Sequence, residues 1–595
     1  MNILGISAFY HESSCCLLRD GRLVAAASEE RFTRVKHDPR LPVEAFRFCL
    51  DREGLDLLDL DAIAYYELPQ AKAERQRWAA SNGTSSDGTA ARFDRQAPER
   101  AIRERLGWEG EILCFPHHLC HAASALYWSG FPRAATLTVD GVGEWATTTY
   151  GRGLGDDLSL FAEVRFPHSL GLLYSTVTAY LGFAVNDGEY KVMGLAPYGE
   201  PRLVDRLGLT VRVEPGPGFS LDLKYFDFVS GTRMWSDAFE ELVGGPPRRR
   251  GGEILPFHRD LARSVQLLLE EILLEKVRWL AGETGEDDLC MAGGVALNCV
   301  ANGRILREGP FRRLFVQPAA GDSGGCLGAA ALANARLGGR PIAREPLRRI
   351  DLGPSFSPRE IAAAIGAAGL AAIDFSGREE DLLDAVAERL ERCQIVGWFE
   401  GRMEHGPRAL GHRSILANPL DPEVRDRLNG RAKKREAFRP FAPAVLAARA
   451  AEHFALDHPS PFMLETCAVR SDLALPGITH IDGSARPQTV DPADHPRFAA
   501  LLAAFERRTG CPILVNTSFN VAGEPIVATP ADALLAAADA ELDALVLGDF
   551  LIDGGDLPAV WRALLPAWRE RRRSGFSGGA LSSTSAISEE LYTFV

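Results

Sequence analysis

The apolar and polar positions at the start of the chain alternate between short strand-like runs and tight turns. Residues 1–9 form an apolar run, and Asp20-Gly21 separates the next two apolar stretches as the turn of a β-hairpin does. A similar arrangement recurs at 134–150, where an apolar run ends at Asp140 and a glycine-containing turn leads into a second strand-like stretch. The pattern therefore predicts two related β-rich beginnings.

Two such beginnings are typical of a duplicated actin-like or sugar-kinase-like fold, in which a nucleotide lies between the halves. Helical patterns fill the region between them, and the polar stretch 80–95 predicts a loop. The Pro-, Gly- and charge-rich stretch 338–358 predicts a linker, after which helix and strand patterns alternate. We therefore expect an α/β protein with domains at 1–345 and 355–568, followed by a low-complexity tail at 569–595.

The composition narrows the class of protein. The chain has 595 residues, of which 46% are hydrophobic and 25% charged, and a net charge of −14, which is ordinary globular composition. The acidic balance argues against nonspecific nucleic-acid binding, which relies on surplus Lys and Arg. Eleven scattered cysteines without a CxxC pair favour a reducing compartment. The apolar N-terminus lacks a basic leader and no stretch is long enough to span a membrane, so we expect a cytoplasmic protein.

The segment HHLCHAASA contains the sharpest local signal for a metal site. His117 and His121 stand four residues apart on a helical pattern and so project from one face, whereas His118 points elsewhere. Asp140 at the end of an apolar strand and Asp322 in the glycine-rich stretch GDSGG add two carboxylates. Two imidazoles and two carboxylates suit divalent iron, manganese or zinc. Alternatively, the histidines are hydrogen-bonded core residues, Asp140 a turn residue and Asp322 a helix N-cap.

Two glycine-containing segments of the first half predict a nucleotide site. Gly293-Gly294 follows a strand-like stretch and precedes a helix that carries Asn298, an arrangement that lets a phosphate or ribose approach the backbone. Lys191, in NDGEYKVMGLAPYG, is placed to reach phosphates, although an ordinary exposed loop explains that segment equally well.

The second half concentrates basic and amide side chains beside Gly, Pro and Phe. This context favours anion capture over a solvated helix face, although salt bridges within an acidic chain are the alternative. Asn516, Ser518 and Asn520 come just after a strand-like stretch, where open α/β sheets commonly bind ligands. The chain lacks both a G-x-S-x-G elbow and a Walker A motif. The predicted site for a phosphorylated small molecule includes Arg408, Lys433, Arg439 and Arg486.

A series of motifs extends over nearly the whole chain in a fixed order. They are FYHESS, EERFTRVKHD, HHLCHAASA, LTVDGVGEW, DGEYKVMGLAPYG, GGVALNCVANG, GDSGGCLGAA, GPRALGHRSILANP, KKREAFRPFAP, DGSARPQTV and VNTSFNVAGEPIV. This series resembles the O-carbamoyltransferases related to nodulation protein U and to the tobramycin and cephalosporin carbamoyltransferases. So many ordered motifs make the resemblance very specific.

The resemblance implies a fold, a reaction and a set of site residues. It implies an N-terminal duplicated actin-like, RNase H-like domain with a metal site, usually iron, at His117, His121, Asp140 and Asp322, and a C-terminal YrdC-like α/β domain. Carbamoyl phosphate and ATP form carbamoyl adenylate in the second domain, in the pocket of Arg408, Lys433, Arg439, Arg486 and Ser518, and Mg²⁺ accompanies the ATP. The first domain then transfers the carbamoyl group to an acceptor hydroxyl beside His11, with Asp227 as a second acceptor-side carboxylate.

The sequence thus predicts an ATP-dependent O-carbamoyltransferase that acts on a hydroxylated small molecule, typically a specialised metabolite such as an antibiotic. The family resemblance suggests a homodimer, and neither a nucleic acid nor a membrane is an expected partner. Two other functions stay open: a tRNA threonylcarbamoyl-type modification enzyme, and a noncatalytic nucleotide-binding protein that keeps the fold. The acceptor, the native metal and the roles of 80–95 and of the tail do not follow from the sequence.

Overall fold

The computed structural model describes residues 1–82, 94–229, 233–342 and 346–565. Most of the predicted 80–95 loop and the predicted tail therefore lie outside the described residues, and the first three residues of that loop belong to a helix, Pro69–Asn82. The described residues form two compact units. Of the described residues, unit 1 contains those of 1–29 and 39–347, and unit 2 contains 30–38 and 348–565.

The first sheet of unit 1 begins with the hairpin that the sequence predicts. Strands β2 and β3 pair antiparallel on either side of Asp20 and Gly21, whose φ angles of 49° and 76° fit the positive values that a tight hairpin turn requires. β1 pairs antiparallel with β2 and parallel with β4, which pairs parallel with β5. The sheet order is β3-β2-β1-β4-β5, formed by β1 (Asn2–Ser7), β2 (Ser14–Arg19), β3 (Arg22–Ser28), β4 (Ala62–Tyr65) and β5 (Ile112–Cys114).

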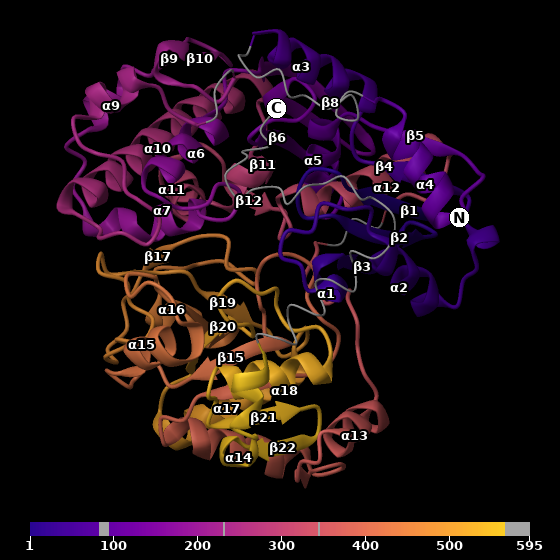
Figure 1. Cartoon of the computed structure of the whole chain (residues 1–595), viewed down its shortest axis with the longest axis vertical. Coiled ribbons are helices and arrows are strands. Elements are labelled where there is room, and N and C mark those ends of the chain that lie inside the picture. Colours follow the sequence, from indigo (N-terminus) through magenta and orange to yellow (C-terminus); the bar gives the residue numbers. More distant parts are fainter. Residues whose placement is uncertain (83–93, 230–232, 343–345, 566–595) are drawn as a thin grey trace. The chain divides into compact units, whose positions relative to one another are not determined.

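The second sheet of unit 1 repeats this topology. Its order, β8-β7-β6-β11-β12, again has three antiparallel strands followed by two parallel ones. Its strands are β6 (Arg133–Val139), β7 (Ala146–Leu154), β8 (Asp157–Arg165), β11 (Asp288–Ala292) and β12 (Arg313–Val316). The repetition confirms the predicted duplicated actin-like, RNase H-like fold of the N-terminal part (Figure 1).

Two helices pack closely at the centre of unit 1. α12 (Gly325–Arg336) packs against β1 and against α5 (His117–Leu126), and a Cβ at Gly328 would lie 1.8 Å from the carbonyl oxygen of Cys120. The small residues of α12 therefore allow the close approach that sets the position of α5. The other helices and the remaining short sheet are α2 (Val43–Glu53), α3 (Pro69–Asn82), α4 (Ala97–Leu106), α6 (Leu170–Tyr180), α7 (Glu189–Leu195), α8 (Val204–Gly208), α9 (Asp237–Val243), α10 (Pro256–Thr284), α11 (Cys299–Glu308), β9 (Val211–Val213) and β10 (Phe219–Leu221).

Unit 2 is an α/β structure built on one mixed sheet of eight strands. The sheet order is β13-β22-β21-β14-β15-β20-β16-β19, and Trp398, Phe498 and Phe505 are fully buried in its core. The strands are β13 (Ile373–Asp374), β14 (Val396–Phe399), β15 (Arg413–Ala417), β16 (Ala442–Leu446), β19 (Gln488–Val490), β20 (Ile513–Ser518), β21 (Ala544–Leu547) and β22 (Phe550–Asp553), with β17 (Cys467–Ala468) and β18 (Ser484–Ala485) as a separate pair. The helices are α1 (Glu30–Thr33), α13 (Pro358–Ala367), α14 (Glu379–Glu391), α15 (Val424–Arg427), α16 (Ala450–His453), α17 (Pro496–Thr509) and α18 (Pro530–Asp539).

Two global features agree with the sequence analysis. All eleven cysteines carry free thiols. Among the described helices, none combines the length and the apolar composition that a bilayer crossing requires.

Candidate functional site

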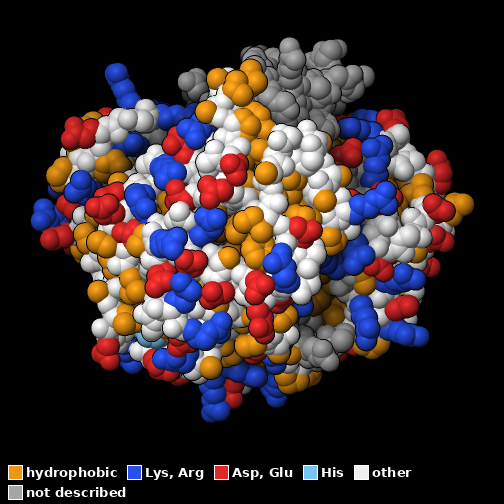
Figure 2. Space-filling model, turned by 90° about the horizontal axis from the view of Figure 1, so that it is seen from below, with side chains coloured by type: hydrophobic (Ala, Val, Ile, Leu, Met, Phe, Trp, Pro, Cys, Tyr) orange, Lys and Arg blue, Asp and Glu red, His pale blue; other side chains and the backbone are white. Residues whose placement is uncertain are grey.

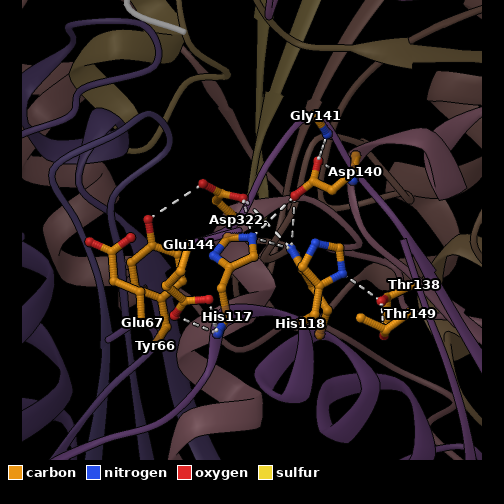
Figure 3. Close-up of polar contacts among 12 residues, drawn as sticks. Tyr66, Glu67, His117, His118, Thr138, Asp140, Gly141, Glu144, Thr149 and Asp322 are labelled. Carbon is orange, nitrogen blue, oxygen red and sulfur yellow. Dashed lines mark hydrogen bonds and ion pairs between the residues drawn. The ribbon is translucent and has the colours of Figure 1, made fainter. Parts of the chain in front are cut away.

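Four side chains from three parts of unit 1 converge on one point. His117 and His121 lie on α5, Asp140 follows β6, and Asp322 lies at the turn that precedes α12. One ligand atom from each of the four lies within 4.8 Å of every other. Asp140 Oδ2 is 3.1 Å from the Nε2 atoms of both histidines, and Asp322 Oδ1 is 3.6 and 3.7 Å from them. Figure 3 shows both carboxylates pointing towards the imidazole of His117.

The chemistry of this cluster fits a divalent metal ion. All four residues are buried, and the two Nε2 atoms are only 3.0 Å apart. Burial by itself raises the pKa of Asp140, but the hydrogen bonds and charges of His117 and His121 hold that pKa well below its usual range. Two nitrogen and two oxygen donors directed at one point suit iron, manganese or zinc, and the ion would replace the protons that otherwise separate these donors.

Backbone and side-chain groups around the cluster hold its ligands in place. Asp140 Oδ1 accepts hydrogen bonds from the amides of Gly141 (2.8 Å) and Gly294 (3.0 Å), which leaves Oδ2 directed at the histidines. Glu144 Oε1 accepts the backbone N–H of His117 (2.9 Å) at the start of α5. Partners of this kind fix the orientation of metal ligands and tune their affinity.

A tyrosine and the third histidine of α5 complete these surroundings. The hydroxyl of Tyr66, which is buried, lies 3.4 Å from Asp322 Oδ2 and donates to it. His118 Nδ1 lies 2.6 Å from Thr138 Oγ1, which in turn contacts Thr149 Oγ1, so this imidazole turns away from the cluster as its position on the helix predicts (Figure 3). Burial and the two neighbouring histidines lower the pKa of His118 well below its usual value, which keeps this imidazole neutral.

Metal binding at this cluster is expected to release a proton from His121. Burial lowers the pKa of this imidazole, but hydrogen bonds to Asp140 and Asp322 outweigh burial and raise the pKa to about 9. The metal-free side chain is therefore protonated at pH 7, whereas a metal requires the neutral form. The apparent affinity for Zn²⁺ should rise about tenfold per pH unit between pH 7 and pH 9 and then level off. Competition for Zn²⁺ between the protein and a chelating dye measures this affinity at each pH. An affinity that does not change between pH 7 and pH 9 would contradict the prediction.

His11, the histidine predicted to lie beside the acceptor, comes directly after Tyr10, a residue that feels the charges of the cluster. His11 follows β1 and stacks beside Tyr10, with ring centroids 4.7 Å apart. Burial and the negative charges of Asp322 and Asp140 raise the pKa of Tyr10. Nδ1 of His11 is buried and makes no hydrogen bond within the described part of the chain. Sequence reasoning identified His11 but missed Tyr10, although both belong to the motif FYHESS.

The structure places Asp227 and Lys191 outside the four-residue cluster. The carboxylate of Asp227 is about one-third exposed and lies 3.9 Å from Nε of Arg233. Lys191 lies on α7, with Nζ 5.6 Å from the ring centroid of Phe183. Their predicted roles at the acceptor and at the nucleotide stay predictions.

The predicted glycine pair lies directly against Asp140, one of the four candidate metal ligands. Gly294 donates its amide to Asp140, and Gly293 has a φ of 95°, so that a Cβ there would lie 2.3 Å from the carbonyl oxygen of Val139. Asn298 caps α11, because its Oδ1 accepts the amide of Ala301 (3.1 Å). The turn therefore joins the candidate nucleotide segment to the candidate metal site.

Replacing Gly293 by alanine is expected to destabilise unit 1. The new Cβ would meet the backbone of Val139 and force an unfavourable φ, which together cost about 1–3 kcal/mol in the free energy of unfolding. Gly282→Ala is the matched control, since a Cβ at this position in α10 has open space. Denaturant unfolding of both variants measures the difference. Equal stability of the two variants would contradict the prediction.

The basic residues of unit 2 surround one end of its sheet. Lys433 ends the helical turn Leu428–Lys433, and its buried Nζ donates to Ser518 Oγ (3.2 Å) and Asn520 Oδ1 (2.9 Å), and to the carbonyl oxygens of both residues. Burial and the nearby guanidinium groups of Arg435 and Arg439 lower the pKa of Lys433 well below its usual value. An anion bound beside Lys433 would favour its charged form and so oppose the effect of burial.

The other residues of unit 2 that were predicted to bind the anion lie in different structural elements. Arg408 lies in the loop between β14 and β15, Arg486 connects β18 to β19, and Arg439 pairs with Glu436 at 3.7 Å. β20 extends through Ser518, so Asn516 and Ser518 lie within the strand and not after it as the sequence pattern indicated, whereas Asn520 does follow it. The buried Nδ2 of Asn516 donates to Gln488 Oε1 (2.8 Å) and to the carbonyl oxygen of Ala409 (3.3 Å), next to Arg408.

Known proteins resemble both halves of this chain. Residues 2–331 match the family model described as carbamoyltransferase N-terminus, and residues 387–553 match carbamoyltransferase C-terminus. An uncharacterized protein (sll1178) of Synechocystis is 42% identical over 93% of this chain and 96% of its own length. The nodulation protein NolNO of Sinorhizobium fredii is 38% identical over 92% of this chain and 79% of its own. The 3'-hydroxymethylcephem-O-carbamoyltransferase of Amycolatopsis lactamdurans is 34% identical over 44% of this chain and 48% of its own.

Proposed function

Because this chain belongs to the carbamoyltransferase family, we propose that it is an ATP-dependent O-carbamoyltransferase. Carbamoyl phosphate, ATP and one water molecule would give carbamoyl adenylate, pyrophosphate and phosphate in unit 2, for which we propose a YrdC-like fold. The carbamoyl group would then pass from the adenylate to a hydroxyl of an acceptor, with AMP as the leaving group. The observation that carries the proposal is that one chain matches both family halves and retains a separate polar cluster in each.

The basic side chains of unit 2 suit the first half-reaction. Carbamoyl phosphate and the triphosphate of ATP must approach each other although both are negatively charged. Arg408, Arg439 and Arg486 would offset this repulsion, and the ammonium group of Lys433, held beside Ser518 and Asn520, would add a further positive charge. Mg²⁺ would accompany the ATP.

The cluster in unit 1 suits the transfer. His11 would accept the proton of the acceptor hydroxyl as its oxygen attacks the carbamoyl carbon, and the Gly293-Gly294 turn would let the nucleotide approach the backbone. An ion such as Fe²⁺, held by His117, His121, Asp140 and Asp322, would supply Lewis-acid polarisation of the carbamoyl adenylate.

The acceptor is proposed to be a hydroxylated small molecule of specialised metabolism, such as an antibiotic precursor. This follows from the cephem O-carbamoyltransferase among the relatives, whose name specifies a hydroxymethyl group. We propose that the protein acts in the cytoplasm as a homodimer. A tRNA acceptor is disfavoured by the net charge of −14 and by the mixture of acidic and basic side chains on the face that Figure 2 shows.

The first half-reaction can be tested without knowing the acceptor. The full chain is incubated with carbamoyl phosphate, ATP and Mg²⁺, and mass spectrometry measures carbamoyl adenylate, AMP and pyrophosphate. We expect pyrophosphate and AMP to appear only when carbamoyl phosphate is present. Nucleotide binding without turnover across several metals and pH values would overturn the proposal in favour of a noncatalytic nucleotide-binding protein.

A further inference from the structure

The loop that carries Arg408 has little regular structure of its own. It connects β14, which ends at Phe399, to β15, which begins at Arg413, and it contains three glycines with positive φ, Gly401 (53°), Gly406 (110°) and Gly411 (104°). Glycine has more conformational freedom than any other residue, so such a loop needs partners for its backbone groups to keep one shape.

One buried carboxylate, that of Glu404, accepts three backbone N–H groups where this loop enters β15. Glu404 Oε1 accepts the backbone N–H groups of Leu410 (2.7 Å), His412 (2.8 Å) and Arg413 (3.3 Å). The side chain is only 4% exposed, so water cannot replace it in this role. Hydrogen bonds to an ionised acceptor are about twice as strong as those between neutral groups.

Side chains from other segments bind the carbonyl groups of the same loop. These contacts hold the stretch on both sides of Arg408, because they involve Gly406 before it and Ala409, Leu410 and Gly411 after it. The donors are Arg31 Nη2 to Gly406 O (2.9 Å), Asn516 Nδ2 to Ala409 O (3.3 Å), Gln488 Nε2 to Leu410 O (2.8 Å) and Trp398 Nε1 to Gly411 O (2.9 Å).

The Arg408 loop, held by these hydrogen bonds, lies beside the Ser518–Asn520 segment that contacts Lys433. β15 pairs with β20 so that Ser414 is opposite Ser518, and the amide of Phe519 donates to the carbonyl oxygen of Arg413 at 2.8 Å. Arg413 therefore makes both contacts. Its backbone N–H donates to Glu404, and its carbonyl oxygen accepts the amide of Phe519 in the Ser518–Asn520 segment. The position of the Arg408 loop relative to Lys433 thus depends on Glu404.

We propose that Glu404 is a positioning residue for the first half-reaction, because its carboxylate fixes the loop that presents Arg408 to carbamoyl phosphate. The inference rests on the proposed function and adds a residue that neither contacts substrate nor carries the charge of the anion site. Its effect should fall on the binding and alignment of carbamoyl phosphate, since a displacement of about 1 Å in a catalytic group can cost about 100-fold in rate.

The test compares three variants of the full chain by carbamoyl phosphate-dependent pyrophosphate release. Glu404→Ala should raise the KM for carbamoyl phosphate at least about tenfold and leave the KM for ATP within about twofold. Glu404→Gln should recover most of the loss, because the amide keeps one oxygen where Oε1 accepts the three N–H groups. Glu400→Ala is the matched control, since Glu400 is a partly buried carboxylate of the same loop that lies 3.6 Å from His412 and 4.0 Å from Arg497; this variant should keep the wild-type KM for carbamoyl phosphate.

The outcomes separate the inference from the proposed function. A wild-type protein without carbamoyl phosphate-dependent turnover would refute the proposed function. Wild-type turnover with an unchanged KM in Glu404→Ala, or an equal KM increase in Glu400→Ala, would refute the positioning role. If Glu404 only stabilised the fold, its replacement would lower the fraction of active protein. The apparent kcat would then fall, while the KM values for carbamoyl phosphate and ATP would not change. If Glu404→Ala does not fold, Glu404→Asp replaces it, because the shorter side chain withdraws the oxygen and should raise the same KM.

Discussion

Replacing His121 by alanine is expected to remove the bound metal and to lower carbamoyl transfer at least about 100-fold, while carbamoyl adenylate still forms at the wild-type rate. His121 Nε2 lies 3.1 Å from Asp140 Oδ2 and 3.0 Å from His117 Nε2, so its loss removes one of four donors and leaves a buried gap. Loss of a partner that only orients a ligand typically costs 10- to 100-fold in metal affinity or activity, and loss of the ligand itself should cost more.

The control for this experiment lies three residues away on the same helix. His118 is equally buried, but its hydrogen bond goes to Thr138 and not to a member of the cluster, so His118→Ala should retain one metal per chain. Metal analysis of the purified variants and separate assays of the two half-reactions measure the result. An unchanged metal content in His121→Ala, or an equal loss in His118→Ala, would show that the cluster is not the metal site.

The sequence predicted the parts of unit 1 that depend on local patterns. The turn at Asp20-Gly21 and the i, i+4 spacing of His117 and His121 are encoded within a few residues, and the structure contains both the hairpin and the shared helix face. The repetition of the strand pattern likewise predicted the duplicated fold, because each half needs the same order of apolar runs.

The parts that the sequence could not predict depend on contacts between distant segments. Tyr66 follows β4 yet reaches Asp322, 256 residues later, and no pattern around Tyr66 indicates that contact. The segment Glu30–Asp38 belongs to unit 2 because Arg31 contacts Gly406 and the guanidinium of Arg34 donates to the carbonyls of Pro525 and Ile526. Sequence spacing carries no information about such pairings.

Replacing Arg408 by alanine should impair formation of carbamoyl adenylate and spare the bound metal, which is the reverse of the result expected for His121→Ala. Arg408 is predicted to neutralise the charge of carbamoyl phosphate, so its loss should lower carbamoyl phosphate-dependent pyrophosphate release about 100- to 1,000-fold, the range observed when one preorganised donor is removed from a transition state. The candidate metal site lies in unit 1, so this variant is expected to keep its metal. Carbamoyl transfer would fall only because its adenylate substrate is no longer supplied.

Adding carbamoyl adenylate to the Arg408→Ala protein should therefore restore transfer, and it should not do so for His121→Ala. Arg392→Ala is the control for loss of a positive charge, because Arg392 is 68% exposed and pairs only with Glu388 among the described residues. If added adenylate fails to rescue Arg408→Ala while its metal content is normal, Arg408 takes part in the transfer as well. If Arg408→Ala and His121→Ala lose adenylate formation to the same extent, the clusters of unit 2 and unit 1 do not serve separate half-reactions. The assignment of adenylate formation to unit 2 and of transfer to unit 1 would then be wrong.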